Sequence, residues 1–161
     1  MQHTTTNACR FCAIAHGVSG EPHDRVWLES DDFAAVVSVG ALVPGWSLVV
    51  PQEHVMNMSQ HLTERATHTF IGDCVEKIEQ AFGPVTLFEH GCTAAQSPTS
   101  CGVGHAHLHL VPLDFSLTKA VFEFDADLAW QACQLSELAS LAAGREYLYF
   151  ADTYAGPGTA G

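Results

Sequence analysis

The most informative stretch of this 161-residue sequence is His105-Ala106-His107-Leu108-His109-Leu110-Val111. Histidine alternates in it with a small or aliphatic side chain, and a period of two is typical of a β-strand. We therefore predict a strand over 105–111, ended by Pro112, with its aliphatic side chains in the core. The three imidazoles then share the other face, with neighbouring rings roughly 6.5 Å apart.

Imidazoles on one face of a strand suit chemistry at phosphorus. A neutral imidazole is a nucleophile and a protonated one is a hydrogen-bond donor, so one ring can attack phosphorus while another binds its oxygens. A covalent intermediate divides one difficult displacement into two easier ones. The same spacing also fits three histidines that bind a metal, or a chance triplet on an ordinary strand. The spacing alone does not choose between catalysis and metal binding.

The flanking sequence predicts an α+β fold in which a mostly antiparallel sheet packs against one long helix. Runs of apolar and β-branched residues predict further strands at 26–29, 33–39, 47–50, 85–89, 121–124 and 147–151. Apolar residues three or four apart predict the long helix over 62–82, with Thr63 as its N-cap and Gly83-Pro84 as its end. A short helix is expected over 136–143, closed by Gly144.

The composition restricts the possible partners. A hydrophobic fraction of 47% with 15% charged residues indicates a packed globule. The formal net charge is −12, from 18 acidic and 6 basic residues, so we expect no binding to nucleic acid. A phosphate group must then be bound by local donors, because the overall charge repels it. No apolar run is long enough for a membrane span and no secretory leader is evident, so we expect no membrane association and a cytoplasmic location.

Two motifs together make the sequence resemble the histidine-triad (HIT) superfamily. The signature His-φ-His-φ-His-φ-φ, with φ apolar, fits residues 105–111 at every position. Residues 44–54, Pro-Gly-Trp-Ser-Leu-Val-Val-Pro-Gln-Glu-His, are similar to the family's Gly-His-x-Leu-Val-Ile-Pro-Lys-x-His segment. The long helix lies between the motifs, as in the family. The resemblance covers roughly residues 9–112 and implies the α+β fold above, often as a homodimer.

The resemblance also implies a reaction. Members cleave or transfer at the α-phosphorus of nucleotide-like substrates through a nucleotidyl intermediate on the middle histidine, which is His107 here. The third histidine, His109, is expected to hydrogen-bond the phosphate oxygens. We favour a hydrolase of nucleotide-type phosphoester, phosphoanhydride or phosphoramidate bonds, with a phosphorylated small molecule or a nucleotide as substrate. The alternatives are a nucleotidyltransferase like the galactose-1-phosphate uridylyltransferases and a nucleotide-binding protein without activity.

A metal site is implied by a narrower resemblance. Cys9 and Cys12 form a C-x-x-C pair, which is half of a four-ligand zinc site. A subset of bacterial histidine-triad proteins completes such a pair with the histidine after the Pro-x-x turn and the first triad histidine. Those positions are His54 and His105 here. We therefore expect structural zinc at these four residues, and His105 is then a ligand rather than the nucleophile. The alternative is that the two cysteines are ordinary thiols.

Several positions depart from the family pattern and bear on the substrate. Ser38 stands where nucleoside hydrolases carry a ribose-binding Asp. Residues 88–91, Phe-Glu-His-Gly, resemble a Phe-Glu-Asn segment of the uridylyltransferases, and Cys101 precedes the first triad histidine by four residues, as in some of them. The residues expected to bind substrate are Ser38, His90, Cys101 and Gly102.

The motifs suggest how the chain is divided. We expect a HIT-like catalytic core over 1–112, which includes the N-terminal zinc ligands. Residues 113–154 carry no recognised motif and are expected to form a C-terminal extension that packs on the core or on a dimer partner. Residues 155–161 are almost all small and are expected to form a flexible tail.

Overall fold

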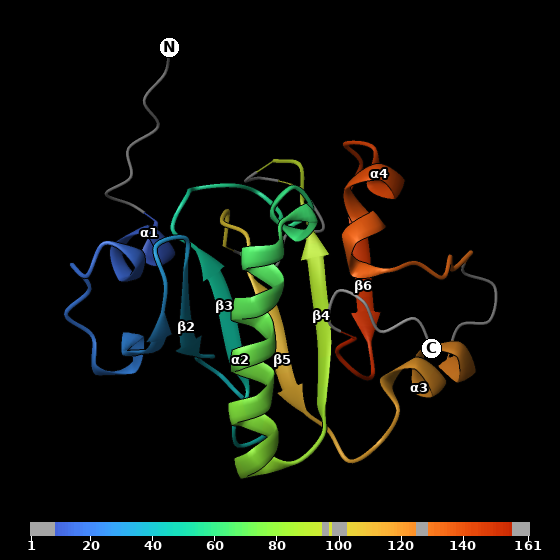
Figure 1. Ribbon diagram of the computed structural model, residues 1–161, viewed down its shortest axis with the longest axis horizontal. Helices are drawn as coiled ribbons and strands as arrows, with labels where there is room; N and C mark the ends of the chain where they lie inside the picture. The colour runs from blue at the N-terminus through green and yellow to red at the C-terminus, as the bar shows by residue number, and fades with distance from the viewer. Residues whose placement is uncertain (1–8, 95–96, 98–102, 125–128, 156–161) are drawn as a thin grey trace.

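The computed structural model describes residues 9–94, 97, 103–124 and 129–155. It has a six-stranded antiparallel sheet in the order β1-β2-β3-β5-β4-β6, with the long helix α2 lying across one face (Figure 1). The strands are β1 (Val26–Glu29), β2 (Phe33–Val37), β3 (Ser47–Pro51), β4 (Val85–Gly91), β5 (Leu108–Pro112) and β6 (Tyr147–Ala151). The helices are α1 (Arg10–Ala15), α2 (Arg65–Phe82), α3 (Leu117–Phe124) and α4 (Leu138–Ala142). The predicted α+β class is confirmed.

Two apolar layers hold the sheet. On the face under α2, the core includes Leu62, Ile71, Val49, Leu87 and Leu108, which are all fully buried. A second cluster on the opposite face joins Phe11 and Ile14 of α1 to Val36, Leu48 and Val50 of β2 and β3. Since successive side chains of a strand alternate between faces, β3 supplies both layers with one run of apolar residues. This arrangement fixes α1 against the sheet near the strand that carries the histidines.

The histidine-bearing strand β5 is central in the sheet. It is inserted between β3 and β4, where His109 pairs with Leu48 on one side and with Phe88 on the other. The strand begins at Leu108, so the predicted start at His105 is wrong. The reason is a contact between distant segments, because the Ala106 amide donates to the Val55 carbonyl oxygen (2.7 Å), in the segment after β3, instead of continuing the ladder. The residues before Leu108 are therefore placed by a loop contact.

Three other helix and strand predictions need correction. The segment 121–124 is not a strand but the end of α3, whose first turn is stabilised by the side chains of Ser116 and Asp152, which accept backbone N–H groups of Lys119 and Thr118. Helix α1 is not predicted by the sequence pattern, because it is only six residues long. Helix α2 begins after Glu64 rather than Thr63, since residues 61–63 form a separate 3₁₀ turn. No described helix is long and apolar enough to cross a membrane.

The C-terminal part of the chain contributes the edge strand β6. It pairs with β4 over residues 147–151, and α3 and α4 lie beside it (Figure 1). The ring of Tyr147 lies against the backbone at Gly91, where a Cβ atom would clash with it. The predicted division of the chain at residue 112 stays a prediction.

A buried carboxyl group links β4 to β6 and to the segment before α2. Glu89 is 1% exposed, and its two oxygens accept the Met58 amide and the Tyr147 hydroxyl, both at 2.7 Å. Burial raises the pKa of Glu89 to about 7, although both hydrogen bonds and the nearby His107 oppose the rise. The protonated form is therefore the one that the fold favours.

We expect Glu89 to make the stability of the fold pH-dependent. Its pKa is higher in the folded chain (about 7) than the ordinary value of 4.5, so its contribution is fully present below pH 4.5 and is lost as the pH rises to 7. Relative to Glu89→Gln, the free energy of unfolding of the wild type should fall by at most roughly 3 kcal/mol over that interval. Urea denaturation between pH 4 and 8 measures it.

The matched control is Glu29→Gln, an exposed strand residue. Its unfolding free energy should follow the wild type at every pH. If Glu89→Gln and the wild type show parallel pH dependence, the buried carboxyl is not the group that couples stability to pH.

Candidate functional site

The triad histidines converge beside helix α1. The ring centroids of His107 and His109 are 4.8 Å apart, and Phe11 of α1 contacts the rings of His105 and His107 at 5.8 Å and 5.2 Å. His105 and His107 are buried, and His109 is half-buried in β5. The site is therefore largely screened from water on its α1 side.

His107 is held by the backbone of the segment that precedes β5. Its Nδ1 lies 2.9 Å from the carbonyl oxygen of His105, which can only accept, so Nδ1 carries the proton and the neutral ring has its lone pair on Nε2. Burial lowers the pKa of His107, while this hydrogen bond and the charge of Glu89 oppose the change. A neutral ring at neutral pH follows, which is the nucleophilic form of imidazole.

His109 is enclosed by two aromatic side chains. Phe88 of β4 stacks on its ring at 4.1 Å with planes 12° apart, and the Trp46 indole Nε1–H donates to its Nδ1 at 3.0 Å. Burial, with a smaller effect from His107, lowers the pKa of His109 to about 3. Trp46 stands where the family segment quoted above has histidine, and the sequence assigns a role neither to it nor to Phe88. The strand register, which brings both residues to His109, was the missing information.

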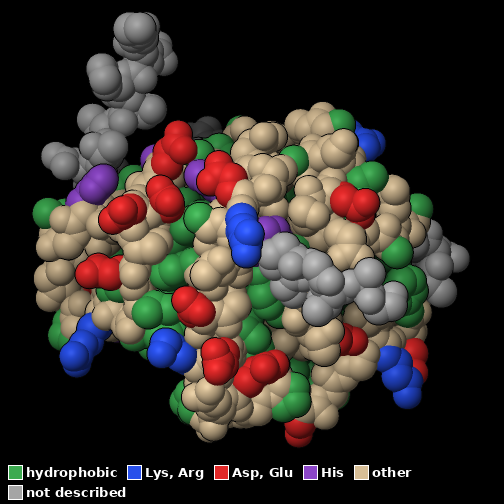
Figure 2. All heavy atoms as spheres, viewed as in Figure 1, with side chains coloured by type: hydrophobic (Ala, Val, Ile, Leu, Met, Phe, Trp, Pro, Cys, Tyr) green, Lys and Arg blue, Asp and Glu red, His purple; other side chains and the backbone are tan. Residues whose placement is uncertain are grey.

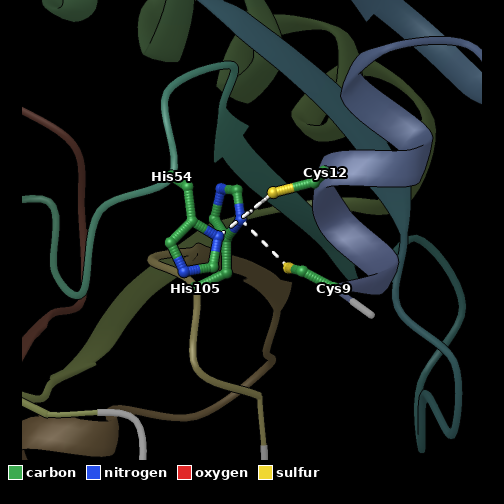
Figure 3. Close-up of side chains that lie close together, drawn as sticks. All are labelled: Cys9, Cys12, His54 and His105. Atoms are coloured by element: carbon green, nitrogen blue, oxygen red, sulfur yellow. Dashed lines mark hydrogen bonds between the residues drawn. The ribbon is translucent and has the colours of Figure 1, made fainter. Parts of the chain in front are cut away.

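Four potential metal ligands lie together on the other side of the site (Figure 3). Cys9 and Cys12 come from the start of α1, His54 from the turn after β3, and His105 from the segment before β5. Their ligand atoms all lie within 4.8 Å of one another. The cluster predicted from the sequence is thus assembled by the fold and could bind a metal.

The distances within this cluster fit a tetrahedral ion. Cys9 Sγ is 3.3 Å from His105 Nδ1, and Cys12 Sγ is 3.1 Å from His54 Nδ1. Around zinc, sulfur and nitrogen ligands are expected roughly 3.6 Å apart. His105 Nε2–H donates to the Pro51 carbonyl oxygen at 3.0 Å, which leaves the Nδ1 lone pair directed at the cluster. Such a carbonyl partner is usual for a metal-binding histidine.

Helix α1 is anchored by a second polar cluster. The Arg10 side chain donates to the carboxylate of the buried Asp24, which also accepts the Ser19 hydroxyl at 2.5 Å. These bonds tie the helix to the segment that leads into β1. They hold the helix that follows Cys9 and contains Cys12 through contacts outside the group of four potential ligands.

The other predicted site residues are more scattered. Ser38 is half-buried just after β2, and its amide donates to the Trp46 carbonyl oxygen at 3.0 Å. His90 is half-buried on β4, two residues beyond Phe88 and therefore on the same face of the strand. Cys101 and Gly102 lie outside the described residues. Roles for these four residues in substrate binding stay predictions.

The surface agrees with the charge balance of the sequence. Figure 2 shows acidic side chains spread over the visible face and basic ones isolated from each other. With a net charge of −12, the molecule has no surplus of positive charge to attract an anionic substrate from a distance. An anionic group at the histidines would therefore need short-range donors.

Comparisons with known proteins support the motif. No protein-family model matches the chain. The protein named hit from Bacillus subtilis strain 168 is 29% identical over 110 residues, which are 65% of this chain and 70% of that protein. A solved structure from Streptococcus mutans UA159 is 25% identical, with a TM-score of 0.55, and the match covers 89% of this chain and 86% of that one.

Two further structures are similar in fold. A HIT family protein from Bacillus anthracis has 18% identity and a TM-score of 0.53, covering 86% of this chain and 95% of its own. A member of the HIT family from Bacillus subtilis has 19% identity and a TM-score of 0.51, and the match covers 76% of this chain and 99% of that one. The chain therefore carries the complete His-φ-His-φ-His-φ-φ motif, which runs into the central strand β5, and it is similar to these histidine-triad proteins in sequence pattern and in fold.

Proposed function

We propose that this protein is an enzyme that hydrolyses nucleotide-type phosphoester, phosphoanhydride or phosphoramidate bonds through a covalent intermediate on His107. The observation that carries the proposal is the 2.9 Å hydrogen bond between His107 Nδ1 and the His105 carbonyl oxygen. It favours the tautomer whose Nε2 lone pair can attack phosphorus. The His109 ring lies beside it, at 4.8 Å between centroids.

In the first displacement, the Nε2 lone pair of His107 forms a bond to the α-phosphorus. The bond from phosphorus to the leaving group breaks, and the leaving group takes that electron pair and a proton from solvent. His109 accepts the Trp46 N–H at Nδ1, so it donates its Nε2–H to a non-bridging phosphate oxygen, where negative charge must be stabilised. Because both rings are neutral, the step needs no prior deprotonation of the nucleophile.

In the second displacement, a water oxygen forms a bond to phosphorus and the nitrogen–phosphorus bond breaks. The electron pair of that bond returns to His107 Nε2, and the water loses one proton to solvent. The product is a phosphate monoester, which is a nucleoside monophosphate for a nucleotide substrate. His107 regains its starting tautomer, still held by the His105 carbonyl oxygen.

We also propose zinc as the metal of the Cys9, Cys12, His54 and His105 cluster. Two thiolates and two imidazoles suit zinc, and four protein ligands leave no position for water, so the ion would be structural. Burial and the neighbouring Cys9 raise the pKa of Cys12 to about 11, so binding at neutral pH must displace a proton from the thiol. The ion would fix α1 to the segment that carries His105.

Two other functions compete with hydrolysis at the same residues. In a transferase, a second phosphate takes the place of water in the second displacement. In a binding protein, the nucleotide stays intact. Product analysis with and without excess acceptor phosphate separates these outcomes. The homodimer, the cytoplasmic location and the substrate contacts of Ser38 and His90 also remain predictions.

The first test is His107→Ala. We expect the variant to lose activity by a factor on the order of 10³ or more, because its nucleophile is gone. Adenylyl and uridylyl phosphoramidates and dinucleoside polyphosphates serve as substrates. After acid-free quenching, mass spectrometry should find an acid-labile nucleotidyl adduct on His107 in the wild type and none in the variant.

The exposed His23 provides the control, and His23→Ala should keep full activity and the adduct. Circular dichroism shows whether both variants are folded. A folded His107→Ala protein with wild-type turnover would refute the proposed mechanism. Tight nucleotide binding without any product would favour the binding protein.

The second test concerns the metal. We expect one zinc per chain by mass spectrometry of the native protein, and Cys12→Ser should lower both the zinc content and the melting temperature. Loss of a structural ion removes folding free energy, so chelation should also lower the melting temperature of the wild type.

Cys133→Ser is the control, since Cys133 is a half-buried free thiol that lies outside the cluster. It should retain its zinc. A zinc-free protein whose melting temperature does not respond to zinc or chelator would overturn the metal assignment.

A further inference from the structure

One contact in the site involves a residue that differs from the family segment quoted above, because Trp46 stands where that segment has histidine. Trp46 lies two residues before Leu48, which pairs with His109 across β3 and β5. Its indole ring is therefore on the His109 face, with Nε1 3.0 Å from His109 Nδ1 and ring centroids 5.7 Å apart. The Trp46 backbone is itself held, because its carbonyl oxygen accepts the Ser38 amide at 3.0 Å. The indole donor is thus fixed in position.

The hydrogen bond between Trp46 and His109 can run in only one direction. An indole N–H donates and cannot accept, so His109 Nδ1 must carry the lone pair. In the neutral ring, the single proton then lies on Nε2. A histidine at position 46, as in the family motif quoted above, can donate or accept and imposes no such choice. Tryptophan removes that ambiguity.

The His109 ring cannot easily flip or change to the other tautomer. Phe88 stacks on it at 4.1 Å, and a flip of the imidazole would place a carbon opposite the indole N–H. A buried N–H that loses its acceptor costs roughly 1–3 kcal/mol. Burial also lowers the pKa of His109 to about 3, so protonation of both nitrogens does not supply the donor at neutral pH. The tautomer alone decides whether His109 can donate.

We infer that Trp46 is a positioning residue that holds His109 in its Nε2–H tautomer, so that His109 offers a fixed neutral donor to the phosphate oxygens. The inference rests on the role proposed for His109. It explains how an acidic protein with neutral histidines can still present a donor to an anionic group. It also accounts for tryptophan at the position where the family motif has histidine.

The test compares Trp46→Phe with Trp27→Phe. Both variants lose an indole N–H and keep an aromatic ring, but the Trp27 N–H has no hydrogen-bond partner among the described residues. Long-range ¹H–¹⁵N NMR reports which nitrogen of His109 is protonated, independently of turnover. The wild type and Trp27→Phe should show a protonated Nε2, and Trp46→Phe should show averaged shifts of mixed tautomers.

Kinetics provide the second readout. We expect kcat of Trp46→Phe to fall roughly tenfold with little change in KM, because the donor acts on charge that develops in the transition state. Trp27→Phe should keep its kcat. Unchanged His109 shifts in Trp46→Phe, an unchanged kcat, or an equal loss in both variants would overturn the inference. If His107→Ala refutes the proposed reaction, the NMR result still tests the tautomer by itself.

Discussion

His105 is the residue on which both parts of the site depend. Its ring places Nδ1 among the cysteine sulfurs, while Nε2–H donates to the Pro51 carbonyl oxygen at 3.0 Å. Its own carbonyl oxygen accepts the Nδ1–H of His107 at 2.9 Å. One residue therefore joins α1, the end of β3 and the nucleophile proposed here. A shift of its backbone would disturb the ligand cluster and the orientation of His107 together.

Neutral groups dominate the electrostatics of the site. Burial lowers the pKa of His107 and His109, and the chain carries a net charge of −12. A phosphate at this site would therefore need a short-range donor such as the N–H of His109, since charge attraction over long distances is lacking. Neighbouring groups that can act in only one way favour one tautomer of each ring: a carbonyl oxygen accepts from Nδ1–H of His107, and an indole N–H donates to Nδ1 of His109. In this site the tautomers of His107 and His109, rather than fixed charges, decide which ring nitrogen can attack and which can donate a hydrogen bond.

The sequence predicts most of the sheet, because strands follow from local patterns, and the resemblance to a subset of histidine-triad proteins predicts which residues form the cluster. The strand at 147–151 matches β6, and the C-x-x-C pair with His54 and His105 forms one cluster. What it does not predict depends on contacts between distant segments. Helix α3 is stabilised at its start by Asp152, and Trp46 and Phe88 reach His109 only through strand register. Glu89 is polar in sequence but buried against Tyr147, a partner 58 residues away.

The covalent intermediate on His107 is the central claim, and the stereochemistry at phosphorus tests it most directly. A nucleotide substrate with a chiral α-phosphorothioate is hydrolysed in ¹⁸O-labelled water, and the configuration of the product is determined. Two successive in-line displacements, first by His107 and then by water, predict net retention of configuration. Inversion would show a single direct attack by water and would contradict the account.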